Sequence, residues 1–259
     1  LFDKYNISCR FNGEEIKGKQ FLLWDHEKEG RHASYKSEEY PPYVNIQEMT
    51  VKTVPYCTYC LNEITYLSGN ITPTECQVCG ETGTIIEKDY KVSGWLGIQR
   101  FFSSHEFGLD IVRNGRIIEQ NTKEIFKWEP REKYNIPQEK LDLLNKTGGV
   151  LPEYPIDNVG LGGRIVGELY VDFIKPLYTK DSFERTELWK DVLETIRGES
   201  PLQNIWATKR LGMSKNKSPL SRLFHPYRNT EPGQANLVCG TIIEGGGANA
   251  GNRLSLSYR

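Results

Sequence analysis

The chain has 259 residues and a formal net charge of −1, with 26% charged and 11% aromatic residues. A chain of this length can bury a substantial core in one large domain or two modest ones, and the composition is typical of a soluble globular protein. The near-zero charge excludes a general polyanion binder, so contact with nucleic acid would need a local basic patch. No stretch approaches the roughly 18 apolar residues of a membrane span, so we expect no membrane contact.

Cysteine usage indicates a reducing compartment. Four of the 6 cysteines form two Cys-x-x-Cys pairs, and the isolated Cys9 and Cys239 are expected to be small buried hydrophobes. Disulfide frameworks belong to small, cysteine-dense secreted domains, and no secretory leader is visible. We therefore expect a cytoplasmic protein, or a nuclear one if the source is eukaryotic. The chain begins with Leu1 rather than Met, which is consistent with a processed product or a fragment.

Residues 1–54 are predicted to be rich in β-structure. The apolar run Phe21–Trp24 and the partly alternating run Met49–Val54 suit short strands. The polar segment from Asp25 to Tyr40 between them is predicted to be a long loop.

Further strands are predicted at Thr84–Ile86, Val92–Ile98 and Ile165–Phe173. The segment Leu109–Ile118 contains Asn114-Gly115 flanked by β-formers. Because both turn residues tolerate the positive φ of a type I′ turn, this segment predicts a β-hairpin.

Two helices are predicted. Residues 137–146 suit a short helix that begins at a proline and ends at Gly148-Gly149. Residues 182–197 give the stronger pattern, with apolar residues at four-residue spacing, Asp181 as N-cap and Gly198 as the stop.

The clearest motif is a set of four cysteines with the spacing C-x2-C-x15-C-x2-C, namely Cys57, Cys60, Cys76 and Cys79. Two Cys-x-x-Cys knuckles can direct four thiolates to one point, which suits tetrahedral zinc. The alternatives are two disulfides, a redox Cys-x-x-Cys or an iron–sulfur cluster. A redox pair normally stands alone, so the second pair favours zinc. A four-thiolate site is coordinatively closed, so we expect a structural zinc ribbon.

The domain prediction follows from this ribbon. Residues 1–54 and 84–243 are expected to form an α+β domain with a mixed β-sheet and a few helices. Residues 55–83 form the zinc-ribbon insertion, and residues 244–259, with their run of glycines, form a flexible tail.

Lys180 is the second candidate site residue. A strand ends before Pro176 and a helix is predicted to begin near Asp181, so Lys180 would stand beside a helix N-terminus. Backbone amides there favour anions, and a lysine adds a mobile positive charge, as a phosphate sensor would require. The alternative is a solvated lysine beside a helix cap.

The segment Gly163–Trp189 resembles the end of the transducer-like domain of GHKL-type ATPases, nearest the microrchidia (MORC) group. Those proteins have a strand, a Lys-Pro, and an Asn-Lys-Gln-Asp-Phe-like run that opens a helix; here the matching residues are Ile174–Pro176 and Thr179–Phe183. The hairpin Leu109–Ile118 also resembles a hairpin of that domain. Together the resemblance covers roughly residues 94–197.

The resemblance implies a transducer that couples ATP binding in a separate N-terminal domain to a clamp-like rearrangement on DNA. Lys180 would reach the ATP γ-phosphate, while ATP and Mg²⁺ would be held by the chain's own or a partner's GHKL domain. The full-length protein would be a homodimer. This chain has no Glu-x-x-x-Asn helix and no Asp-x-Gly-x-Gly loop, so alone it is not expected to hydrolyse ATP. A zinc insertion is also not a usual part of the transducer.

Residues 200–230 contain no Asp or Glu but many basic residues with aromatic residues interleaved. Such a composition suits contact with a nucleic-acid backbone. The alternative is a solvated basic loop that packs on an acidic partner domain. The second functional hypothesis for the whole chain is a non-enzymatic zinc-ribbon module that binds nucleic acid or protein. The candidate DNA-contacting residues are Lys209, Arg210, Lys215, Lys217, Arg222 and Arg228.

Overall fold

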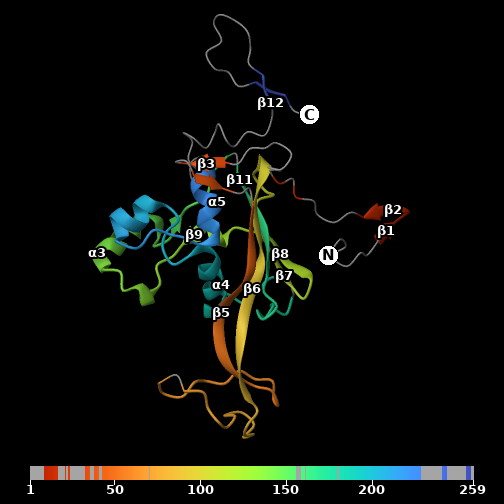
Figure 1. The fold of residues 1–259 in the computed structure, drawn as a ribbon, viewed down its shortest axis with the longest axis vertical. Helices are drawn as coiled ribbons and strands as arrows, with labels where there is room; N and C mark the ends of the chain where they lie inside the picture. The colour runs from red at the N-terminus through yellow and green to blue at the C-terminus, as the bar shows by residue number, and fades with distance from the viewer. Residues whose placement is uncertain are drawn as a thin grey trace, which may run out of the picture.

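The structure, a computed structural model, describes residues 9–16, 21, 23, 33–35, 38–40, 43–69, 71–155, 159–160, 162–179, 181–228, 241–243 and 255–257. The predicted α+β class is confirmed, since a mixed five-stranded sheet has the order β5-β6-β11-β7-β8 (Figure 1). Its strands are β5 (Tyr43–Cys57), β6 (Ile85–Ser103), β7 (Gly108–Arg113), β8 (Arg116–Thr122) and β11 (Gly163–Tyr170).

Among the described residues, the remaining elements are strand pairs and helices. Four two-stranded antiparallel pairs join β1 (Cys9–Phe11) to β2 (Glu14–Ile16), β3 (Ala33–Tyr35) to β4 (Glu38–Tyr40), β9 (Lys127–Trp128) to β10 (Leu151–Pro152), and β12 (Thr241–Ile243) to β13 (Ser255–Ser257). The helices are η1 (Glu124–Phe126), η2 (Glu132–Tyr134), α3 (Gln138–Leu141), η3 (Asp142–Thr147), α4 (Glu187–Arg197), the π-helix η4 (Ile205–Leu211) and α5 (Pro219–Arg228).

Strand β11 lies at the centre of the sheet. It pairs antiparallel with β6 on one side and parallel with β7 on the other. Residues 163–167 are all buried, as expected of a strand covered on both faces. Gly94 of β6 permits the close pairing, because a Cβ there would lie 2.0 Å from the backbone oxygen of Glu168.

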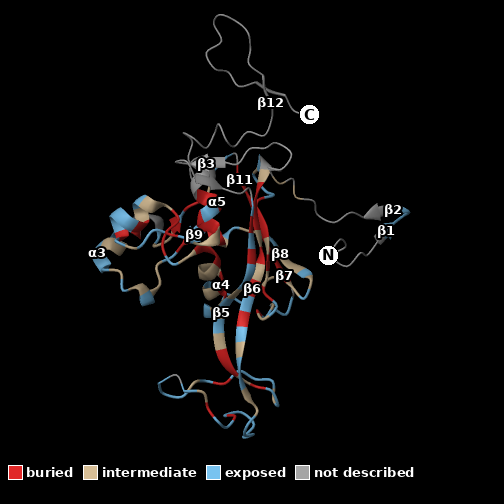
Figure 2. Ribbon diagram, viewed as in Figure 1, coloured by how far each residue is buried: buried red, intermediate tan, exposed pale blue. Residues whose placement is uncertain are grey.

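The main core lies between the sheet and the helices α4 and α5, which contact β5 (Figures 1 and 2). Leu96 and Ile98 of β6 are fully buried there, as are Val192 and Ile196 of α4. Phe224 of α5 completes this cluster at 2% exposure. The helical face at four-residue spacing is therefore the core face of α4, as its sequence predicts.

A buried ion pair fastens the end of α4 to the segment after β10. Arg197 donates to the Glu153 carboxylate, and the two side chains are 6% and 0% exposed. The other carboxylate oxygen of Glu153 accepts the Leu202 amide at 2.7 Å. Arg197 also donates to the Ile125 carbonyl at 3.2 Å. The charges are thus paired and hydrogen-bonded, which buried charges require.

Strands β5 and β6 extend beyond the other three strands as a two-stranded arm (Figure 1). The pairing of β6 with β11 runs only from Ser93 to Ser103, whereas β6 pairs with β5 as far as Ile85. We call residues 49–92 the arm and residues 57–85 its tip. Most arm residues are partly or fully exposed (Figure 2).

Several predicted elements need correction. The segments predicted at Thr84–Ile86 and Val92–Ile98 are not two strands, because the single 19-residue strand β6 begins at Ile85 and covers the rest of both. The predicted loop Asp25–Tyr40 includes the β3–β4 pair. The predicted strand Ile165–Phe173 instead runs from Gly163 to Tyr170.

The helix predictions are partly confirmed. Residues 137–146 split into a four-residue α-helix followed by 3-10 structure, and Gly148-Gly149 ends them at φ of 68° and 80°. The helix predicted at 182–197 begins only at Glu187, with Thr186 as N-cap; its Gly198 stop is confirmed at φ 84°. Asp181 is therefore not a helix cap. The hairpin at Asn114-Gly115 is confirmed, with φ of 48° and 74°.

Candidate metal centre and loop site

The four predicted cysteines meet at the tip of the arm. Their Sγ atoms all lie within 4.8 Å of one another. The Cys57–Cys79 and Cys60–Cys76 sulfurs are 3.8 and 3.6 Å apart. A disulfide would need about 2.05 Å. All four are free thiols, so the two-disulfide alternative does not fit.

These distances fit one metal ion. Four sulfurs placed tetrahedrally at about 2.3 Å from zinc are separated by about 3.8 Å. A multi-iron cluster would lie between its cysteines and hold them farther apart. The four cysteines could therefore bind a single metal ion such as zinc.

The two knuckles have the same backbone design. In each, the residue after the second cysteine donates its amide to the carbonyl of the first, Leu61 to Cys57 at 3.0 Å and Gly80 to Cys76 at 2.8 Å. Both donors have positive φ, 59° at Leu61 and 76° at Gly80. This repeated turn aims both cysteines of each pair to the same side.

Hydrogen bonds prepare the sulfurs for metal binding. The Thr84 hydroxyl lies 3.3 Å from the Cys57 sulfur, and the Val78 amide donates to the Cys76 sulfur at 3.4 Å. The backbone amide of Cys60 and then the Thr84 hydroxyl lower the pKa of Cys57 to about 6. Because the thiolate is the metal ligand, these donors favour the form that binds at Cys57 and Cys76. At Cys79 the backbone hydrogen bond from Glu81 lowers the pKa, but burial and the neighbouring cysteine sulfurs outweigh it and raise the pKa to about 12.

The surface of the tip is apolar and acidic. No Lys or Arg occurs between Thr53 and Glu87. Three exposed acidic residues, Glu63, Glu75 and Glu81, lie in the tip instead. Its exposed large apolar side chains are Tyr59, Leu61, Leu67, Ile71 and Val78.

Lys180 itself lies outside the described residues, but its neighbours define a loop. Pro176 and Phe183 form a β-bridge, and the Leu177 amide donates to the Ser182 carbonyl at 2.8 Å. Tyr178, two residues before Lys180, is fully exposed at 101%. Because α4 begins at Glu187, no helix N-terminus begins at Asp181, and that part of the phosphate-sensor argument is wrong.

The β7–β8 hairpin contacts the chain before this loop and the last residue of the loop. Four residues before the loop, the Asp172 carboxylate accepts the Asn114 amide at 2.6 Å, and Arg113 donates to the Asp172 carbonyl at 3.1 Å. At the end of the loop, the Phe183 amide donates to the Glu119 carboxylate at 2.9 Å. The two segments that carry the family resemblance are therefore in direct contact.

The candidate DNA-contacting residues are spread over η4, the following loop and α5. Lys209, Arg210, Lys215, Lys217 and Arg222 are exposed, whereas the side chain of Arg228 lies outside the described residues. Of the interleaved aromatic residues, Phe224 is buried in the core, so it cannot stack on a base. The Arg210 guanidinium covers the Trp206 ring at 4.3 Å.

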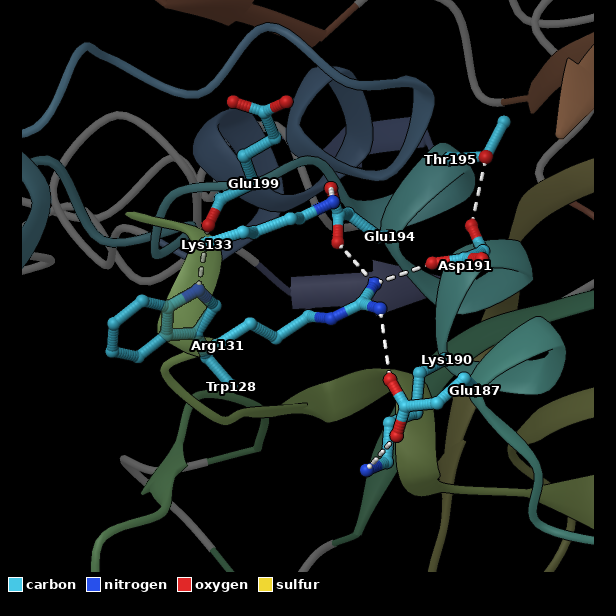
Figure 3. A network of polar contacts seen from close by, with 9 residues as sticks. All are labelled: Trp128, Arg131, Lys133, Glu187, Lys190, Asp191, Glu194, Thr195 and Glu199. Carbon is cyan, nitrogen blue, oxygen red and sulfur yellow. Dashed lines mark hydrogen bonds and ion pairs between the residues drawn. The ribbon is translucent and has the colours of Figure 1, made fainter. Parts of the chain in front are cut away.

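A cavity of about 760 Å³ lies between residues 127–134 and α4. Arg131 bridges it, donating to Asp191 and Glu194 at 2.6 Å and to Glu187 at 3.0 Å (Figure 3). These charges satisfy one another, so the network fastens the segment to the helix and offers no free ligand group.

Sequence reasoning missed Glu119, Arg185 and Glu124. Arg185 lies 66 residues from Glu119, and no motif connects them. His105 lies in an exposed turn in which Ser103 Oγ accepts the His105 and Glu106 amides. Among the described residues, no helix is long and apolar enough to cross a membrane.

Comparisons with protein-family models, curated proteins and solved structures find no match.

Proposed function

We propose that this chain is the transducer region of a GHKL-type ATPase nearest the microrchidia group. It would couple ATP binding in a separate N-terminal domain to a clamp-like rearrangement on DNA. One observation carries the proposal. The two segments that resemble the transducer are in contact, because Asn114 in the turn of the hairpin Leu109–Ile118 donates its amide to Asp172 of the segment Gly163–Trp189. Glu119, the residue after that hairpin, accepts the amide of Phe183 at the end of the loop that contains Lys180. Independent short matches would not be expected to meet in this way.

The described loop residues have properties that suit insertion into another domain. Tyr178 is fully exposed and Leu177 is 39% exposed, so two large apolar side chains precede Lys180 without cover from the described parts of this chain. An exposed apolar group next to a cation suits contact with a partner surface that binds phosphate. The lysine would stabilise charge on the transferred phosphoryl group.

In this proposal the chain supplies one cation, while the nucleotide and Mg²⁺ are held by a GHKL domain outside these 259 residues. A Glu-x-x-x-Asn motif and an Asp-x-Gly-x-Gly motif in the remainder of the gene would support it. We also infer that the metal at the tip is zinc with a structural role, because all four tetrahedral positions are filled by thiolates.

The proposal predicts that Lys180→Ala lowers ATP turnover by the full-length protein. The expected fall in kcat is about 100-fold, the scale for removal of one charge-stabilising donor. Lys175→Ala is the matched control, since Lys175 is an exposed lysine of the same segment. Steady-state turnover and nucleotide-dependent dimerisation should be measured together. Unchanged values of both in Lys180→Ala would end the sensor assignment.

The second candidate function is a non-enzymatic module, and the tip favours protein over nucleic acid as its partner. Exposed apolar residues with acidic residues and no Lys or Arg would repel a phosphate backbone. In either function, contact with DNA would then come from η4, α5 and the loop between them, not from the tip.

We therefore predict that replacing Lys209, Arg210, Lys215, Lys217 and Arg222 by Gln weakens binding to duplex DNA and flattens its salt dependence. Removal of each phosphate-binding side chain should reduce the slope of log K against log salt by roughly one. Tyr59→Ser with Val78→Ser at the tip is the control and should leave affinity unchanged. Loss of affinity in the tip variant instead would assign DNA binding to the tip.

A further inference from the structure

We propose that the ion pair between Glu119 and Arg185 is the device that positions the loop 176–183, so that both are positioning residues for ATP turnover. This inference rests on the proposed function of Lys180. It assigns a role to β8 and to the residues before α4 that the resemblance does not supply.

The contact between the two side chains is bidentate. Arg185 Nη1 lies 2.9 Å from Glu119 Oε1, and Nη2 lies 2.8 Å from Oε2. Arg185 Nε donates to Glu124 Oε1 at 2.8 Å. The planar guanidinium is thus fixed by two carboxylates, a geometry that lysine cannot reproduce.

Glu119 links this ion pair directly to the backbone of the loop. The Oε1 atom that accepts from Arg185 also accepts the Phe183 amide at 2.9 Å, and Oε2 accepts the Thr122 hydroxyl at 3.1 Å. The Glu119 side chain is only 11% exposed. Burial raises the pKa of Glu119, but the hydrogen bonds from Arg185 and Phe183 outweigh it and hold the pKa below its usual value. The carboxylate therefore stays charged where the loop ends.

Packing joins the same point to α4. Phe183 is 2% exposed and stacks with Trp189 at 6.2 Å between ring centroids. The Arg185 guanidinium lies 5.1 Å from the Trp189 ring, and Trp189 Nε1 donates to Glu124 Oε2 at 2.8 Å. The end of the loop, β8 and the first turns of α4 are therefore joined by direct contacts.

The chain just before the loop is held separately. Phe173 stacks on Tyr90 of the arm at 4.9 Å, and Asp172 bonds the turn of the β7–β8 hairpin. With the chain before the loop fixed by these contacts, the Glu119–Arg185 pair decides where the end lies. Exposed ion pairs contribute little to stability, but this pair also holds a backbone amide and lies beside a buried aromatic residue.

The experiment compares Arg185→Gln, Glu119→Gln and Arg185→Lys in the full-length protein. Both glutamine variants should lower kcat about 10-fold, while KM for ATP stays within about two-fold. A mispositioned loop lowers the fraction of molecules whose Lys180 can reach the nucleotide, but it leaves nucleotide binding unchanged. Arg185→Lys should recover part of kcat, because lysine restores the positive charge but not the bidentate contact of the guanidinium with Glu119. The kcat of the double glutamine variant should be no lower than that of either single variant, because both substitutions break the same interaction.

A second readout does not depend on ATP. Hydrogen exchange of amides in residues 176–183 of this chain should quicken in Arg185→Gln while exchange in β11 stays unchanged. Lys190→Gln is the control, because it removes an exposed ion pair with Glu187 on the neighbouring helix. Unchanged exchange in Arg185→Gln overturns the inference.

The two proposals fail separately. If Lys180→Ala lowers turnover but the Arg185 and Glu119 variants do not, the positioning role is wrong and the proposed function stands. If Lys180→Ala leaves turnover unchanged, the proposed function is wrong, and so is a positioning role in turnover, whatever the exchange rates show.

Discussion

Leu61 illustrates strain at a single residue of the metal centre. It occupies the left-handed conformation that Gly80 occupies in the other knuckle. That conformation costs a residue with a side chain about 1–2 kcal/mol, and glycine almost none. Leu61 is 67% exposed, so its side chain contributes little packing that could offset the strain.

We predict that Leu61→Gly binds zinc about 5-fold more tightly than Leu61→Ala, because about 1 kcal/mol of strain is relieved in the folded knuckle. Comparing glycine with alanine removes the effect of losing the leucine side chain. Competition with a chromogenic chelator measures the affinity.

The control is Gly80→Ala, which should weaken zinc binding by a similar factor. Within 4 Å, a Cβ at Gly80 would meet only a Glu75 carboxylate oxygen, at 3.9 Å. Gly80→Ala therefore measures the cost of the positive φ and not the cost of steric crowding. Equal affinities for Leu61→Gly and Leu61→Ala would show that the conformation costs nothing at this position.

At the scale of elements, sequence prediction succeeded where the chemistry is local. The turn at Asn114-Gly115 and the end of α4 at Gly198 depend on positive φ at the named residues. The Cys-x-x-Cys pairs are equally local, and the cysteines meet as predicted. Helix α5 could also have been found, since Ser218 precedes Pro219 and its hydroxyl accepts the Ser221 amide at 3.2 Å.

The start of α4 could not be found in the same way. Asp181 and Glu184 give the sequence of a capping box, but Phe183 is buried and its amide bonds Glu119 across the fold. These long-range contacts keep residues 181–186 out of the helix. Strand β6 was predicted as two pieces because polar residues interrupt its alternation, whereas pairing with β5 makes it continuous.

At the scale of the whole molecule, the sheet and the tip of the arm differ in how much buried apolar surface stabilises them. The sheet and its helices share one large core. At the tip, the hydrophobic cluster of the described residues consists of Cys57, Ile64 and Cys76, with Cys60 and Ile85 packed against them. The sequence indicated the metal site, but its place at the end of a long arm depends on the pairing of β5 with β6, which no local pattern specifies.

We therefore predict that removing zinc unfolds the tip and leaves the sheet folded. Protein purified without chelators should contain about one zinc per chain by mass spectrometry. The metal supplies on the order of 10 kcal/mol to a small zinc domain at neutral pH, far more than the tip's few buried residues can. After chelation, the amides of Leu61 and Gly80, which bond the knuckle carbonyls, should lose protection from hydrogen exchange. Amides of β11 should keep theirs, because their core does not include the tip.

The control is Cys76→Ser, which should show the unprotected tip before chelation and no further change after it. Re-addition of zinc should restore protection in the original chain only. Less than about half a zinc per chain would contradict the metal assignment itself. Loss of protection throughout β11 on chelation would contradict the separation of the two units, since it would mean that the tip stabilises the sheet. The arm would then be part of the main folding unit, and a change at its tip could reach the loop through the stacked rings of Tyr90 and Phe173.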